Sequence, residues 1–187
     1  MVHDLTLIRS SHPRLKWLVH PSIAVYLRLV CILAVTTAAA AKSWVIRLDG
    51  AGPVKVGMTL AQLNATLKED FSIPTNEDEQ ACFYAETTRH PGIAFMVEHG
   101  RVTRVDVRER GLATVAGVRV GDPEALVMKV YGQRLKVEQH AYDPGEHYLT
   151  LYSANGRYGL RFETGDGKIT SFYAGEQHAI AYIEGCQ

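Results

Sequence analysis

Residues 54–63 constrain the fold most, because they combine an extended lead-in, a glycine and the start of a helix. Thr59 suits a helix N-cap, and Gln62 three residues later completes a capping box. A weaker copy at 118–126 places Asp122 at the N-cap and Pro123 at the first helical position. Two copies of one helix start predict two similar structural units.

Strand-like segments follow both helix starts. Residues 148–152 and 158–163 alternate between polar and apolar side chains, and Asn155-Gly156 between them is typical of a hairpin turn. We therefore predict an α+β fold with repeats at about 52–110 and 116–175, each one helix plus three or four antiparallel strands. The strands of both repeats are expected to merge into one antiparallel sheet with both helices on one face. A last strand is expected over 179–184.

Strand alternation also assigns side chains to the two faces of the sheet. The apolar set expected to face the helices is Ile93, Phe95, Val97, Leu149, Leu151, Leu160 and Phe162. The opposite face is expected to carry Met96, Tyr148, Tyr152 and Arg161, and one face of an antiparallel sheet can stay open to solvent. Tyr and Arg are common anchors of protein interfaces, so these four residues form a candidate binding face. Strand propensity alone is the competing explanation for the tyrosines.

The first 41 residues have the layout of a signal peptide. Basic residues including Arg28 precede a short apolar run, and small residues through Ala41 resemble a cleavage site. A membrane anchor is the alternative, but Arg28 leaves an apolar run shorter than the roughly 20 residues that span a bilayer. We expect a signal peptide at 1–41 and a single exported domain at 42–187, in the periplasm or secreted, with no membrane contact after cleavage.

Charge and cysteine content follow from this division. The whole chain has 20 basic and 20 acidic residues; without residues 1–41 a net charge of about −3 remains. The remaining part has no basic run, so a nucleic acid is not an expected partner. Cys82 and Cys186 are the cysteines of this part, and in an oxidising compartment they are expected to form a disulfide. A redox pair or a metal site is the alternative use of two cysteines.

The segment Val56-Gly57-Met58-Thr59, the repeated helix-plus-sheet unit and the expected export together resemble the β-lactamase-inhibitor-protein fold and the small outer-membrane-assembly lipoproteins related to it. The resemblance implies a binding protein that uses its open sheet face. The chain departs from these families in two ways. It lacks a lipobox, and its expected disulfide links the two halves, whereas the inhibitors have disulfides within each repeat.

Patterns for catalysis or for metal and phosphate binding are weak. The histidines after residue 41 do not have the H-E-x-x-H spacing, although His147 lies near Glu146 and Asp143. The glycines at the helix starts lack the further glycines and lysine of a phosphate loop. We expect no cofactor, no metal and no enzymatic activity. The hypothesis is an envelope or secreted protein of bacterial type that binds an unidentified envelope or extracellular protein; a small secreted hydrolase is the alternative.

Overall fold

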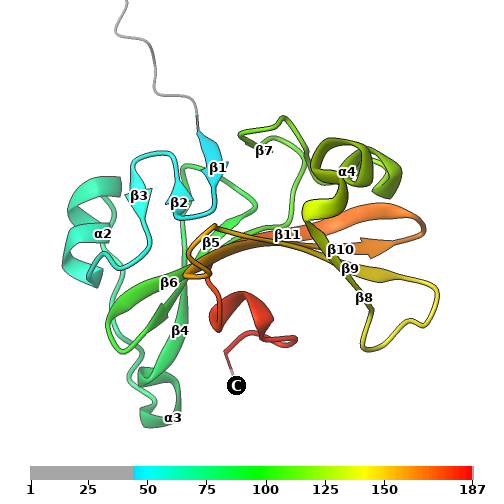
Figure 1. Ribbon diagram of the computed structural model, residues 1–187. Helices are drawn as coiled ribbons and strands as arrows, with labels where there is room; N and C mark the ends of the chain where they lie inside the picture. Colours follow the sequence, from blue (N-terminus) through cyan, green and yellow to red (C-terminus); the bar gives the residue numbers. More distant parts are fainter. Residues whose placement is uncertain (1–43, 187) are drawn as a thin grey trace, which may run out of the picture. The chain divides into compact units, whose positions relative to one another are not determined.

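The computed structural model describes residues 44–186 (Figure 1). They belong to the second of the two units into which the chain divides, Lys42–Gln187. The signal peptide expected at 1–41 lies outside the described residues.

The described chain is a mixed α+β structure with two sheets. The larger sheet has seven antiparallel strands in the order β4-β5-β6-β11-β10-β9-β8. Its strands are β4 (Cys82–Glu86), β5 (Ile93–Glu98), β6 (Arg101–Val107), β8 (Leu135–Gln139), β9 (His147–Tyr152), β10 (Tyr158–Gly165) and β11 (Lys168–Glu176). Strands from both halves thus share one antiparallel sheet, joined where β6 pairs with β11.

A second, four-stranded sheet was not predicted. It has the order β3-β2-β1-β7, with strands β1 (Val45–Arg47), β2 (Gly50–Ala51), β3 (Val54–Lys55) and β7 (Ala113–Thr114). The pair β1 and β7 is parallel, so this second sheet stands beside the antiparallel sheet that was expected. Strands of two or three residues carry almost no periodicity, which is why the sequence pattern did not reveal them.

The helices are α2 (Leu60–Leu67), α3 (Glu77–Gln80) and α4 (Glu124–Tyr131), with 3-10 turns η1 (Gly132–Arg134) and η2 (Ala179–Ala181). α2 begins with the expected capping box, in which the Thr59 side chain accepts from the Gln62 N–H and the Gln62 side chain accepts from the Thr59 N–H. α4 begins one residue later than expected. Pro123 is its N-cap, and Asp122 instead accepts a hydrogen bond from the backbone N–H of Arg119. Helix ends fray, and a one-residue shift of this kind is common.

Equivalent backbone hydrogen bonds fasten both helix starts to the sheet. In the first half the Leu60 N–H donates to the Gly100 carbonyl, and in the second the Glu124 N–H donates to the Gly167 carbonyl. Gly57 and Gly121 precede these starts with φ angles of 91° and 85°, a region that glycine enters without steric cost. These bonds and angles explain why the sequence contains the same short pattern twice.

One hydrophobic core joins the helices to the sheet. Leu63 and Leu67 of α2 and Val127 and Tyr131 of α4 belong to the same buried cluster as the strand residues. All seven apolar side chains predicted to face the helices are in it: Ile93, Phe95, Val97, Leu149, Leu151, Leu160 and Phe162. The strand alternation therefore predicted the core face correctly.

Candidate protein-binding surface

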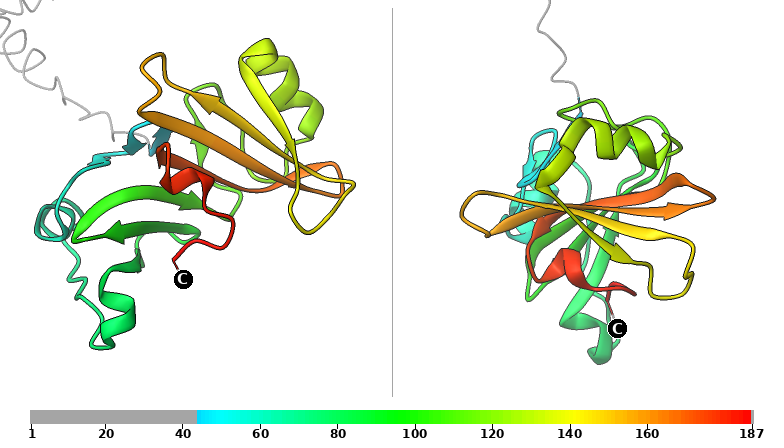
Figure 2. Two further views of the ribbon diagram at one scale, coloured as in Figure 1. Left: turned by 60° about the horizontal axis from the view of Figure 1, so that its bottom comes forward. Right: turned by 45° about the vertical axis from the view of Figure 1, so that its right-hand side comes forward.

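The predicted binding face is covered rather than open. Residues 178–186, which we call the C-terminal segment, lie against the sheet in contact with β6, β10 and β11 (Figure 2). Met96, Tyr148 and Arg161 are buried, and Tyr152 is half-buried. The expectation of an open face is thus wrong. The predicted C-terminal strand is also wrong, because Ala179–Ala181 forms a 3-10 turn.

Arg104 on β6 is the main anchor of the C-terminal segment. Its Nη1 donates to the backbone carbonyls of Ala179 at 2.8 Å and Tyr182 at 3.3 Å. Its Nε and Nη2 donate to the two carboxylate oxygens of Asp106 at 2.6 and 2.8 Å. Arg104 and Asp106 are both buried, and Asp106, which also has Arg108 at 3.6 Å, compensates the Arg104 charge. One arginine thus links the sheet to the turn that covers it.

Aromatic rings enclose this ion pair. The Arg104 guanidinium lies 4.4 Å from the centre of the Tyr173 ring, and its Nη2 donates to the Tyr84 hydroxyl at 2.6 Å. Burial, together with the nearby Asp106 carboxylate, raises the pKa of Tyr84 to about 12. Burial, together with Glu163, also raises the pKa of Tyr173. Both phenols therefore remain neutral at ordinary pH.

Arg161 on β10 holds the same turn from a second strand. Its Nη1 donates to the Ile180 carbonyl at 3.4 Å, and its guanidinium lies 4.0 Å from the centre of the Tyr148 ring. Ile180 itself is fully buried. Two residues of the predicted binding face, Tyr148 and Arg161, thus support a segment of the same chain.

The disulfide predicted from the sequence is present between Cys82 and Cys186. It ties the end of the C-terminal segment to β4, with 5.4 Å between the two Cα atoms. The residues it joins are 104 apart in sequence, so it closes a loop that spans both halves. The segment is therefore held by a covalent bond at its end and by arginine hydrogen bonds at its start.

A groove of about 510 Å³ runs beside the C-terminal segment. Tyr142, Tyr182 and Ile183 line it and are exposed, Tyr142 by 66% of its surface. The Tyr182 hydroxyl donates to Glu98, and the Tyr142 hydroxyl donates to Glu184. We call these five residues the C-terminal patch. No local pattern predicts this patch, because its members come from three separate segments that meet only through the path of the C-terminal segment.

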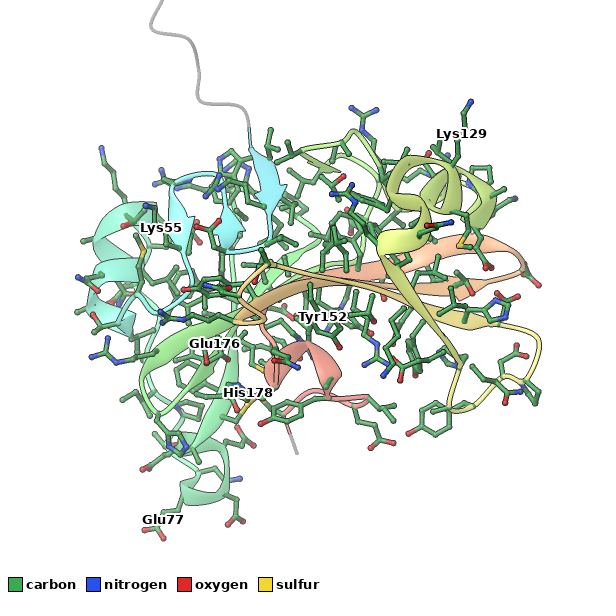
Figure 3. The ribbon with its side chains drawn as sticks, viewed as in Figure 1. Lys55, Glu77, Lys129, Tyr152, Glu176 and His178 are labelled. Carbon is green, nitrogen blue, oxygen red and sulfur yellow. A yellow bond between two sulfur atoms is a disulfide. The ribbon has the colours of Figure 1, made fainter. Side chains whose placement is uncertain are left out.

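A second hollow, of about 630 Å³, is also lined by Ala181 of η2. Tyr152 lines it, as do Glu176 and His178, and Figure 3 shows these three side chains near the C-terminal turn. The His178 ring lies 3.3 Å from Glu98 and 3.5 Å from Glu176. Tyr152, one of the four residues predicted for the binding face, therefore lines a surface hollow.

The side chains weighed as a metal site point to different partners. His147 contacts Glu124, Glu146 accepts from the Gly167 N–H, and Asp143 accepts from the Gly145 N–H. Within residues 44–186, no three His, Cys, Asp or Glu side chains are grouped so that they could hold a metal ion. None of the helices in this part of the chain is long and apolar enough to span a membrane.

Comparisons with known proteins add a distant structural likeness. The chain is similar to the uncharacterized protein YfeY from Escherichia coli, with a TM-score of 0.41 and 14% sequence identity, over 71% of this chain and 99% of that one. No model of a protein family matches the sequence, and no curated protein does so.

Proposed function

We propose that this chain is an exported protein-binding module whose contact surface is the C-terminal patch. The observation that carries the proposal is the cluster of exposed Tyr142, Tyr182 and Ile183 beside the 510 Å³ groove. Tyr is enriched among the residues that dominate the free energy of protein association, and such residues tend to lie in pockets. The surface differs from the one predicted, but the class of function stays the same.

Rigidity of the patch supports this role. The C-terminal segment is fixed by the disulfide, by Arg104 and by Arg161. A surface that is ordered before binding loses less conformational entropy when a partner arrives. The hydroxyl groups of Tyr142 and Tyr182 are oriented by Glu184 and Glu98, which leaves the flat ring faces as contact area.

The charge of the groove indicates the chemistry of the partner. Among residues 44–186, its lining includes Glu98 and Glu184 and no Lys or Arg. Complementary charge across an interface guides association and excludes wrong partners. The proposed occupant is therefore a protein segment that presents an apolar side chain next to a lysine or arginine.

Export is part of the proposal. A disulfide is typical of proteins in oxidising compartments. The signal-peptide layout of residues 1–41 supports the same location, in the periplasm or outside the cell.

We also propose that the two halves are copies of one structural unit, as in the families that the sequence resembles. The matched bonds from Leu60 to Gly100 and from Glu124 to Gly167 support this proposal. So do the isolated bridges between Thr59 and Arg101 and between Pro123 and Lys168.

To test this proposal, a photo-cross-linking benzophenone amino acid is placed at position 183 of the whole chain. The purified protein is then mixed with envelope extract of the source organism and irradiated. Val115 is the matched control, because it is an apolar side chain with 73% exposure that lines a different pocket, together with Tyr131 and Leu160. The proposal is supported if position 183 cross-links to one protein. The cross-linked peptide of that protein should contain Lys or Arg, and added salt should reduce the yield of the cross-link. Equal products from both positions, or none from position 183, refute the proposal.

A further inference from the structure

Strand β8 forms one edge of the seven-stranded sheet and pairs within the described residues only with β9 (Figure 1). The opposite edge, β4, carries the disulfide that brings the C-terminal segment against it. Lys136, Val137 and Gln139 of β8 are exposed. An edge strand presents a row of backbone donors and acceptors that another strand can use.

The hydrogen-bond pattern identifies which backbone groups face outward. The His140 N–H donates to the Glu146 carbonyl at 2.8 Å, in register with the ladder between β8 and β9. Hydrogen-bonded positions alternate along an antiparallel pair, so Glu138 and Lys136 also bond to β9. The N–H and C=O groups of Val137 and Gln139 therefore point away from the sheet, as does the Leu135 C=O, while the Leu135 N–H donates to the Gly132 carbonyl.

The side chains of β8 are complementary to themselves. Lys136 and Glu138 lie on one face of the strand, with the Lys136 Nζ 2.9 Å from a Glu138 carboxylate oxygen. Val137 between them points to the other face and is 45% exposed. With one positive and one negative charge, the strand does not repel a copy of itself.

We propose that β8 is a self-association strand that pairs antiparallel with β8 of a second copy of this chain, centred on Val137. In this register Val137 lies opposite Val137 of the second copy, and their outward backbone groups bond to each other. Lys136 then lies opposite Glu138 of the second copy, and Glu138 opposite its Lys136. These charges occupy the non-hydrogen-bonded positions, where side chains across an antiparallel pair come closest. The register thus satisfies the outward N–H and C=O groups of Val137 and the Gln139 N–H, matches both charges and covers the exposed valine.

A second copy of this chain fits the edge because opposite charges flank Val137 at equal spacing, Lys136 on one side and Glu138 on the other. Charged side chains on an edge strand commonly prevent pairing, and a run of like charge has that effect. A Lys and a Glu spaced equally about the centre have the opposite effect on a two-fold pair. One short strand pair buries less surface than a standard interface, so we expect dissociation at about 10–100 μM.

Charge exchange tests the register. Lys136→Glu places two acidic residues opposite two acidic residues, and Glu138→Lys does the same with basic residues. Sedimentation equilibrium should show each single variant at least about tenfold weaker in dimerisation than the wild type. An equimolar mixture of the two, and the double variant Lys136→Glu with Glu138→Lys, should form dimers again. A wild type that stays monomeric up to about 1 mM, or single variants that dimerise unchanged, would overturn the proposal.

Val137→Pro provides an independent test of the backbone contact. The Val137 N–H is not used by β9, and proline is tolerated at such positions of an edge strand. We expect this variant to keep its circular dichroism spectrum and to lose dimerisation. A folded Val137→Pro variant that dimerises like the wild type would show that another surface is responsible.

Discussion

Arg104 and Asp106 lie two residues apart on β6 and form two charge-assisted hydrogen bonds, at 2.6 and 2.8 Å, beneath the C-terminal segment. Removing Asp106 leaves the Arg104 guanidinium buried without its carboxylate, whereas Asp106 also has Arg108 at 3.6 Å. We expect Asp106→Ala to lower the free energy of unfolding by about 3–5 kcal/mol. Urea unfolding measures this loss.

A control substitution and a double variant distinguish the loss of this ion pair from a non-specific effect of substitution on stability. Asp49→Ala removes the acid of the exposed pair Arg47–Asp49 and should cost at most about 1 kcal/mol. Arg104→Met combined with Asp106→Leu should cost less than the sum of the two single changes, because neither charge is left alone. Strict additivity would contradict this account of the pair.

The raised pKa of Tyr84 predicts a loss of stability at alkaline pH. A raised pKa means that the folded state holds the phenol proton more tightly than the unfolded chain does. The stabilisation is therefore complete below about pH 10, the unperturbed tyrosine pKa, and is lost as pH rises to about 12. Urea midpoints between pH 9 and 11.5 should fall more steeply for the wild type than for Tyr84→Phe. Parallel slopes would show that Tyr84 is not linked to folding in this range.

The disulfide is expected to stabilise the fold as well as hold the C-terminal segment. Cys186→Ser should lower the free energy of unfolding by about 2–5 kcal/mol, because it frees a long loop in the unfolded chain. It should also speed hydrogen exchange at residues 179–182. The wild type measured in a reducing agent is the matched comparison and should behave alike. Identical unfolding midpoints with and without the bond would refute the prediction.

Gly159 on β10 is required by the close approach of Ile180. A Cβ atom at position 159 would lie 2.3 Å from the Ile180 Cδ1. We expect Gly159→Ala to cost about 1–3 kcal/mol, and Ile180→Val, which removes that methyl group, to recover part of the loss. Gly175→Ala is the control, because its Cβ would meet the Thr103 backbone oxygen at 2.2 Å and Ile180→Val cannot relieve that contact. Equal effects of Ile180→Val on both alanine variants would argue against the proposed contact.

Local patterns of the sequence predicted the features that depend on neighbouring residues. The Thr59 capping box and the inward alternation of Leu149, Leu151, Leu160 and Phe162 follow from spacing alone. The bond between Cys82 and Cys186 followed from the expected compartment and the cysteine count.

Features that depend on distant contacts were missed. Alternation assigned Tyr148 and Arg161 to the correct side of the sheet, but it carries no information on what covers that side. The cover depends on Ala179 and Ile180, a short apolar run that reads equally well as a strand end or as a turn. The C-terminal patch was missed for the same reason, since Tyr142 and Ile183 meet only after the C-terminal segment has docked.

The central claim is that binding occurs through the C-terminal patch. The most direct test is to measure the dissociation constant of the complex between this protein and the partner found by cross-linking. Isothermal titration calorimetry would compare the wild type with Ile183→Asp and with Val115→Asp, two changes at exposed apolar positions. We predict that Ile183→Asp weakens binding at least about tenfold, equivalent to about 1.4 kcal/mol, and that Val115→Asp leaves it unchanged. Unchanged binding by Ile183→Asp, or a loss with Val115→Asp, would contradict the account.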